Sequence, residues 1–336
     1  MKQHIQKWGR MLLSVGVGAV GVWLLARDVA VADVFTAAGQ AHWGYVAGAV
    51  AVVFLTPLLK AWRWRWLFPA EAADLPLLHL IRIILVAMFF GQIVPIARLG
   101  EVSRVVLLGG RIPRAQILST LVVEKVLEVV MVVLSLLLVL PLVAMPPNMG
   151  QPQTWALLGV GLLVGLAAVA YTAEPLTRLS ERVTNWLPAA VGGRLHKLIA
   201  TGLQGVMALR HGRALGRVLA ASVGVVMLYW LAPYLLFQAF AIPLGPAEAV
   251  LLNGVLLLGL VPSSAPGNVG VFEFLCLAVL RPLDATDEAT LLGFALLFHG
   301  IVLLPQLVGG VLAVGVWGEV GAGRQRSGGA EEQRGS

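Results

Sequence analysis

Charge is scarce in this chain, since only 12% of its 336 residues are charged, whereas an ordinary soluble domain has about 25%. The single cysteine, Cys276, excludes an intramolecular disulfide framework. The sequence also has no Gly-x-Ser-x-Gly elbow, no His-Glu-x-x-His zinc signature and no Walker A loop. We therefore favour a function that is not enzymatic and uses no metal or cofactor, and we exclude an ATP-driven pump for this chain alone.

Apolar residues make up 59% of the chain, and its mean hydropathy is +0.88. A soluble core cannot bury that much apolar surface, so the composition indicates an all-α polytopic membrane protein. The net charge of +7 fits basic residues gathered in cytoplasmic loops better than nucleic-acid binding. Apolar runs of sufficient length predict spanning helices at Met11–Ala26, Trp43–Leu59, Ile117–Leu140, Trp155–Thr172, Val218–Ala241 and Leu291–Trp317.

Two further apolar regions, Leu78–Leu108 and Glu248–Leu280, are interrupted by proline and glycine. If both are re-entrant hairpins and the N-terminus is cytoplasmic, most of the 24 basic residues fall on the cytoplasmic side. A full crossing at either region would move every later loop to the other side and remove this bias. We therefore predict six spanning helices and two re-entrant hairpins, with both termini cytoplasmic; the alternative is that the breaks are kinks in ordinary spans.

The two broken regions share an order of residues: glycine, apolar residues, proline, a glycine-rich bend and a glutamate, which is Glu101 in the first and Glu273 in the second. Each lies between two spans, and the two would enter the membrane from opposite sides, as in an inverted-topology repeat. We predict one transmembrane domain at 1–320, with halves at about 43–140 and 218–317, an interfacial cytoplasmic loop at 174–217 and a disordered tail at 321–336.

Three charged residues, Arg98, Glu101 and Arg104, follow the first break. Charge at membrane depth is costly and usually functional. Because arginine forks suit phosphate oxygens, we expect Arg98 and Arg104 to contact a phosphate or head group, with Glu101 orienting them or binding a cation. The alternative is a salt bridge at the cytoplasmic edge.

A second charged group, Glu124, Lys125 and Glu128, lies early in the following span. Glu124 and Glu128 are one helical turn apart, so they share a face and need a cation, a proton or an arginine partner. Arg98 or Arg104 could supply it. A purely structural network that locks the hairpin to the span is the alternative, and both roles can hold together.

The second broken region has one acidic residue between positions 251 and 280, which is Glu273. Such a carboxylate is neutral, paired across the repeat, or part of a proton or ion path. Ser263 and Asn268 could bind lipid oxygens by hydrogen bonds or cap the bend. His299, in the last span, is either a packed histidine or a member of a polar site.

Two segments have patterns typical of the membrane surface. Tryptophans alternate with arginines along Trp62–Trp66, which is more often an interface anchor than a ligand site. In Arg194–Arg210, apolar residues recur at helical spacing opposite a basic face. That pattern indicates either an interfacial helix on anionic lipid or a loop helix packed on the bundle.

Three motifs taken together resemble the transmembrane-region family of lysylphosphatidylglycerol synthetases, which are flippase-like integral membrane proteins. The segment Pro95–Arg104 is similar to the family's Pro…Arg-x-Gly-Glu-x-x-Arg, Glu124–Glu128 to Glu-Arg-x-x-Asp, and Pro266–Glu273 to Pro-Gly-Gly-x-Gly-x-x-Glu. This chain has Lys where the family has Arg, Glu where it has Asp and Asn where it has Gly. These differences preserve the charge or the ability to form a turn. The resemblance implies lipid flipping between leaflets, without the soluble aminoacyl-transferase domain that lysylates lipid.

We therefore expect a lipid transporter of the bacterial inner membrane, whose partners are lipids with polar head groups, either anionic or phosphate-containing, and, in addition, lipid-synthesis enzymes. Two rival functions are a membrane-embedded or accessory component of glycosyl or polyprenyl-phosphate transfer, with the glutamates as bases or metal ligands, and a scaffold that gathers such enzymes through its basic loop. The expected substrate-binding residues are Arg98, Glu101, Arg104, Glu124, Lys125, Glu128, Ser263, Asn268 and Glu273.

Overall fold

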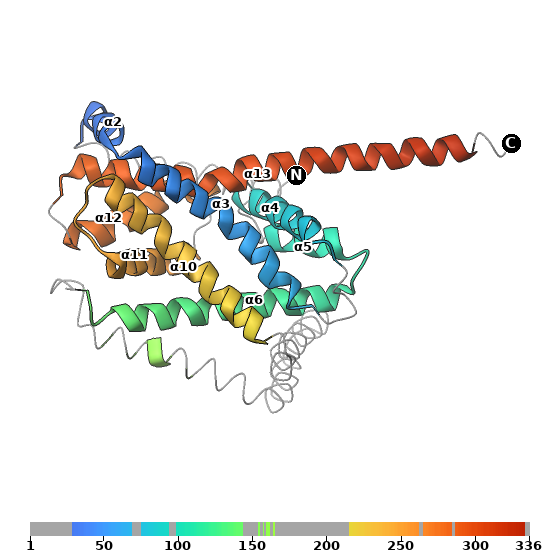
Figure 1. The fold of residues 1–336 in the computed structure, drawn as a ribbon, viewed down its shortest axis with the longest axis horizontal. Helices are drawn as coiled ribbons and strands as arrows, with labels where there is room; N and C mark the ends of the chain where they lie inside the picture. The colour runs from blue at the N-terminus through green and yellow to red at the C-terminus, as the bar shows by residue number, and fades with distance from the viewer. Residues whose placement is uncertain are drawn as a thin grey trace, which may run out of the picture.

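The computed structural model describes residues 29–68, 75–93, 99–143, 215–261, 265–283 and 286–332, together with residues 154, 157, 159–161 and 164. Within these ranges every regular element is a helix, which confirms the all-α prediction (Figure 1). Met11–Ala26, most of Trp155–Thr172 and nearly all of the loop 174–217 lie outside the described residues. The prediction of six spans therefore stays a prediction.

Three helices are long and apolar enough to cross a membrane: α3 (Trp43–Arg65), α10 (Leu215–Ala239) and the first part, Glu288–Ala313, of α13. Large apolar side chains on the outside of the bundle are exposed, among them Leu138, at 69%, and Leu312, at 65%. In water such surfaces would cause aggregation, whereas acyl chains solvate them without cost. The chain is a multi-pass membrane protein.

Two helices extend further than their sequence predicts. The span that begins at Trp43 is expected to end at Leu59, but α3 continues to Arg65 because its last turns carry Lys60 and Arg63 against acidic groups of a neighbouring helix. Likewise, α13 (Glu288–Glu332) is helical through most of the segment 321–336, for which the sequence predicts disorder, and it projects beyond the bundle in Figure 1.

The first half of the bundle consists of α3, the pair α4 (Leu77–Ile93) and α5 (Leu99–Leu108), and α6 (Arg114–Val139). The first broken region is thus two helices that pack against each other. Gly100 makes this approach possible, since a Cβ at this position would collide with the main-chain oxygen of Ala87 on α4. The sequence break therefore creates a tightly packed helical pair.

The second half repeats this order with α10, the pair α11 (Pro246–Gly259) and α12 (Val271–Leu283), and α13. Between α11 and α12 lies η3 (Pro266–Asn268), one turn of 3₁₀ helix. The chain turns here through left-handed backbone at Gly267, Asn268 and Gly270, with φ of 63°, 57° and 82°. Glycine and asparagine are the residues that tolerate this conformation, so the sequence fixes the position of the bend.

The halves also repeat their packing partners. In each half the first helix packs on the broken pair that follows it, as α3 does on α4 and α10 on α11. Between the halves, α3 packs along α10, α4 contacts α13, and α6 contacts α11. The bend at η3 lies against α4, so the second broken region packs against the first.

The close approach of α5 to α4 can be tested by adding one methyl group. Gly100→Ala should destabilise the protein by about 1–3 kcal/mol, because α5 must move away from the main chain of Ala87. Gly91→Ala is the matched control, since it is a helical glycine of α4 whose Cβ would meet nothing within 4 Å. Unfolding by SDS titration in mixed micelles measures both; equal stability of the two variants would contradict the packing.

Candidate functional site

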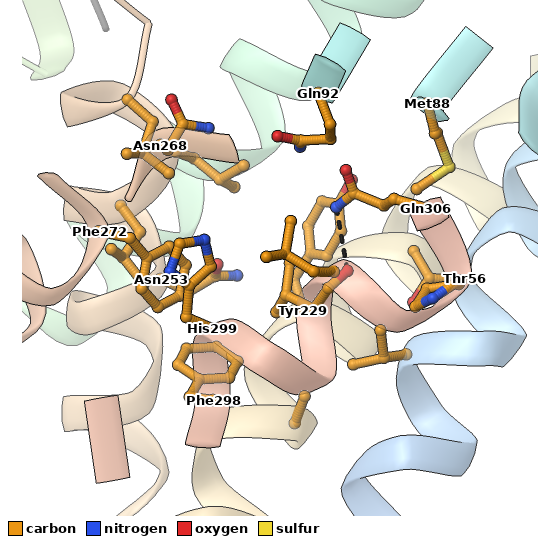
Figure 2. Close-up of a pocket in the computed structure, with 18 of the residues that line it drawn as sticks. Thr56, Met88, Gln92, Tyr229, Asn253, Asn268, Phe272, Phe298, His299 and Gln306 are labelled. Atoms are coloured by element: carbon orange, nitrogen blue, oxygen red, sulfur yellow. Dashed lines mark hydrogen bonds between the residues drawn. The ribbon is translucent and has the colours of Figure 1, made fainter. Parts of the chain in front are cut away.

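A cavity of about 240 Å³ lies between the two halves of the bundle. Its wall comes from both halves: α3 and α4 on one side, and α10, α11, η3, α12 and α13 on the other (Figure 2). Most of the lining is apolar, and the polar exceptions are mainly uncharged. They are Thr56, Lys60, Gln92, Tyr229, Asn253, Asn268, His299 and Gln306.

The two broken regions bring their ends to this cavity. Met88 and Gln92 lie near the end of α4, just before the first break, while Gly267 and Asn268 lie in the second. Gln306, whose amide donates to the Val302 carbonyl at 3.0 Å, points into the cavity from α13 (Figure 2). Most small-molecule sites have this composition, an apolar wall with a few polar groups that orient the ligand.

Asn253 is a polar residue of the wall with a buried side-chain nitrogen that lacks a hydrogen-bond partner in the part of the chain that the structure describes. Its side chain is buried, and its amide nitrogen Nδ2 has no hydrogen-bond partner among the described residues. An unsatisfied buried donor costs about 1–3 kcal/mol, so native proteins rarely retain one without a reason. Because Asn253 borders the cavity, a ligand there can accept the missing hydrogen bond.

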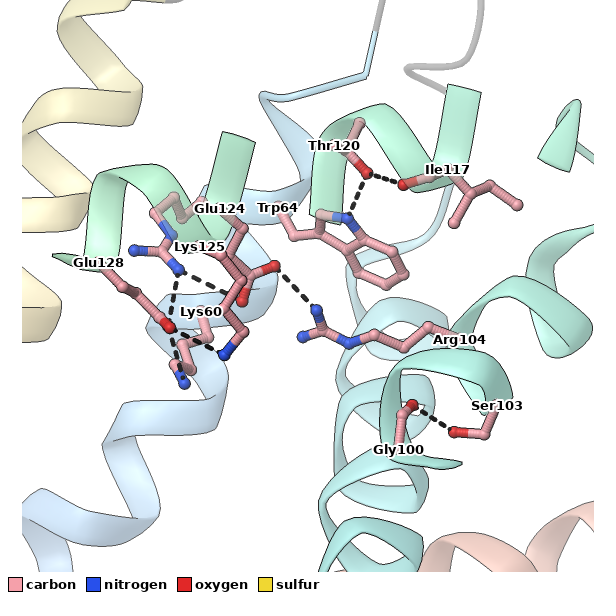
Figure 3. A network of polar contacts seen from close by, with 11 residues as sticks. Lys60, Trp64, Gly100, Ser103, Arg104, Ile117, Thr120, Glu124, Lys125 and Glu128 are labelled. Carbon is pink, nitrogen blue, oxygen red and sulfur yellow. Dashed lines mark hydrogen bonds and ion pairs between the residues drawn. The ribbon is translucent and has the colours of Figure 1, made fainter. Parts of the chain in front are cut away.

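An ion-pair network joins the helices of the first half (Figure 3). Glu124 of α6 accepts from Arg104 of α5 at 2.8 Å and lies 3.3 Å from Nη2 of Arg63 on α3. All three side chains are buried. Arg104 was one of the two partners expected for Glu124, and the structure identifies Arg63 as an additional one.

Glu128, one turn further along α6, binds the remaining cations of this network. Its carboxylate lies 3.1 Å from Lys60, 3.3 Å from Arg63 and 3.1 Å from Lys125. Lys60 also lies over the ring of Tyr229, with its ammonium 5.5 Å from the ring centroid. Lys60 therefore connects the network to the cavity, because both Lys60 and Tyr229 line it.

Trp64 is part of this network and is fully buried, which differs from the interface anchor predicted for Trp62–Trp66. Its indole N–H donates to Thr120 at 2.9 Å, and the guanidinium of Arg104 lies 4.6 Å from its ring centroid. The ring thus supports Arg104 by a cation–π contact.

A second polar group lies where α12 and α13 meet the bend. His299 Nδ1 is 2.6 Å from Glu273 Oε1, and His299 Nε2 is 2.8 Å from the carbonyl oxygen of Gly267. The other oxygen of Glu273 accepts from the Gly270 N–H at 2.7 Å. Phe272 stacks on the imidazole with ring centroids 4.4 Å apart. Glu273 is therefore paired within its own half, and His299 is a packed histidine that is also part of a polar site.

The expected site residues separate into two groups in the structure. Asn268 lines the cavity, and Glu273 reaches its wall through His299. Arg104, Glu124, Lys125 and Glu128 belong to the ion-pair network, and Glu101 lies in the first turn of α5. Arg98 and Ser263 lie outside the described residues. Direct contact of these residues with a head group stays a prediction.

Several residues of the site are absent from the expected set. Lys60 and Arg63 share a helix face by their spacing of three, but the pattern alone places them in a basic loop after a long apolar run. Asn253, Gln92 and Gln306 are isolated amides inside apolar helices. That isolation was the available signal, because a polar side chain within a span usually has a partner or a ligand.

The ion-pair network predicts a large stability difference between adjacent positions of α6. Glu124→Ala should destabilise the protein by about 3–5 kcal/mol, because it removes the carboxylate that pairs with the buried guanidinium of Arg104 and leaves buried Arg63 with Glu128 alone. Lys125→Ala should cost less than about 1 kcal/mol, because its side chain is 55% exposed. SDS-titration unfolding of both variants measures the difference, and similar losses would show that Glu124 does not hold α3 and α5 to α6.

Comparison with known proteins gives one finding. No curated protein and no solved structure matches the chain significantly. The model of a family described as the lysylphosphatidylglycerol synthase TM region matches residues 11–310, a range that contains the first half of the bundle, the second half as far as residue 310 of α13, the residues that line the cavity and all three sequence motifs. The chain therefore belongs to the lysylphosphatidylglycerol synthase TM region family.

Proposed function

We propose that this protein is a lipid transporter that moves a polar lipid between the leaflets of a bacterial inner membrane. Its family is named after the membrane region of an enzyme of lysylated phosphatidylglycerol, which supports a membrane lipid as the substrate. The head group crosses in the cavity between the halves, while the acyl chains stay in the bilayer beside the exposed apolar faces of the helices.

The arrangement of the halves supports transport through an inverted repeat. Each helix of the first half has a counterpart in the second: α3 and α10, α4 and α11, α5 and α12, and α6 and α13. Under this assignment, contact between α4 and α13 is equivalent to contact between α11 and α6, and both contacts occur. In our proposal the pairs α4–α5 and α11–α12 are re-entrant hairpins that approach the midplane from opposite sides, as in many secondary transporters.

Burial of an amide that lacks a partner is the observation that carries this proposal. Asn253 is buried on α11 beside a cavity that both broken regions border, and its Nδ2 is free to donate among the residues described. A purely structural cavity between apolar helices would be lined by apolar side chains. A head group with oxygen acceptors accounts for Asn253 and for the neighbouring amides of Gln92 and Asn268.

Lys60 supports a lipid whose head group carries phosphate. The ammonium group of Lys60 is the lysine or arginine charge of the described cavity wall. In the ion-pair network that contains Lys60, four cationic side chains share the carboxylates of Glu124 and Glu128; the cations are Lys60, Arg63, Arg104 and Lys125. The excess positive charge lowers the free energy of an anion in the cavity. In this proposal Lys60 contacts the phosphate, whereas Arg104 helps to hold the helices of the wall in position through its ion pair with Glu124.

Replacing Asn253 by leucine separates binding from stability. The two side chains are similar in size, and Asn253→Leu removes a donor that the protein does not use, so stability should stay equal or increase. Exchange of fluorescent NBD-phosphatidylglycerol between leaflets of proteoliposomes, followed by dithionite quenching, should slow roughly fivefold for a lost hydrogen bond of about 1 kcal/mol.

Leu258→Ala is the control for this experiment, because Leu258 lies on the same helix but faces outward and is 41% exposed. It should exchange lipid at the wild-type rate. Normal exchange by Asn253→Leu would contradict the assignment of the cavity, and wild-type proteoliposomes that exchange no faster than protein-free vesicles would contradict the proposed function.

A further inference from the structure

The contacts of His299 determine how many protons it shares with Glu273. A carbonyl oxygen only accepts, so the contact of Nε2 with Gly267 requires a proton on Nε2. Nδ1 and the carboxylate oxygen of Glu273 are 2.6 Å apart, which also requires a proton between them. The pair is therefore either carboxylate and imidazolium or carboxylic acid and imidazole. Both forms contain one proton more than an ionised glutamate beside a neutral histidine.

Burial favours retention of that proton. Glu273 and His299 are 3% and 5% exposed, and loss of the proton would leave one negative charge in an apolar environment. The main-chain N–H of Gly270 is the further donor to Glu273, and it cannot neutralise a charge. With the proton bound, the pair carries no net charge.

The titratable groups that the structure describes on the surrounding helices do not compete with Glu273 and His299 for this proton. On α12 the nearest titratable group is the buried thiol of Cys276, and Tyr229 of α10 and Lys60 of α3 line the same cavity. Lys60 is bound to Glu128. The residues that α11 and α4 contribute to the wall, Asn253 and Gln92 among them, do not titrate. Among the described residues that border the cavity, no second carboxylate competes for the proton.

The proton also connects α13 to the bend of the second broken region. With it, His299 donates to Gly267 and pairs with Glu273, so α13, η3 and α12 are joined through one ring. After deprotonation the ring has a single N–H for two acceptors, and one of the two contacts is lost. The bend borders the cavity and lies against α4, so its release changes the wall between the halves.

We propose that Glu273 and His299 form a proton-binding site that couples lipid movement to a proton gradient. This inference rests on the proposed transport function and supplies its energy source. One proton enters from water on one side of the membrane, occupies the position between Nδ1 and Oε1, and leaves to water on the other side. The protonated pair holds the bend in place, and the deprotonated pair releases it.

Glu273→Gln tests this proposal because it keeps the hydrogen bonds and removes the exchangeable proton. The glutamine oxygen accepts from Gly270, its NH₂ group donates to Nδ1, and a neutral histidine still donates from Nε2 to Gly267. Glu248→Gln is the matched control, since Glu248 lies at the start of α11, outside the cavity wall, and accepts from Gly245 N–H. Potentiometric titration in nanodiscs from about pH 6 to about pH 9, above the range in which ordinary carboxylic acids titrate, should release one proton fewer from Glu273→Gln than from Glu248→Gln; equal proton release in this range would overturn the proton site.

The coupling is measured by the steady-state leaflet distribution of NBD-phosphatidylglycerol in proteoliposomes with a pH gradient. Coupling to one proton shifts the ratio between leaflets by up to about tenfold per pH unit in the wild type and in Glu248→Gln. The ratio should stay near equality in Glu273→Gln and in wild type treated with nigericin. An even distribution in wild type that still exchanges lipid would overturn the coupling alone, and absence of exchange would overturn the transport function with it.

Discussion

Burial of charge in an apolar bundle is the constraint on which the rest of this structure depends. A carboxylate removed from water is stable only with a full set of partners, and Glu124 meets this requirement with guanidinium groups from two other helices. Because those partners come from α3 and α5, satisfying Glu124 fixes both helices against α6. The second half meets the same requirement at an equivalent helix pair, α12 and α13, with Glu273 and His299.

Because buried charges need partners, most of the buried charged side chains among the described residues lie in the ion-pair network, whereas most polar side chains that line the cavity are uncharged. Most of the charges neutralise one another in this network, where Trp64 and Thr120 complete the packing around Arg104. The wall itself presents amides, hydroxyls, the imidazole of His299 and one ammonium group. Such a weakly polar wall suits the proposed transport, because a lipid that bound several fully ionised arginines would be released slowly.

Local patterns in the sequence predict the helices and breaks well, because the length of an apolar run and the positions of proline and glycine affect the backbone close to them in the sequence. Four predicted spans overlap the helices α3, α6, α10 and α13, of which α3, α10 and the first part of α13 are long and apolar enough to cross a membrane, and both broken regions are paired helices. Partners across the bundle are not predicted in this way. Arg63 and Glu128 are 65 residues apart, and His299 and Glu273 are 26 apart. Only packing shows that Lys60 and Arg63 face α6, or that Asn253 faces a cavity.

The central claim is that the cavity between the two broken regions accepts a lipid head group. A high-resolution cryo-EM map of the protein in phosphatidylglycerol nanodiscs tests it most directly. The account predicts head-group density within hydrogen-bond distance of Nδ2 of Asn253 and close to Lys60, with acyl density leaving between the helices. A cavity empty of lipid density, with ordered lipid only around the outer faces of α3, α10 and α13, would contradict it.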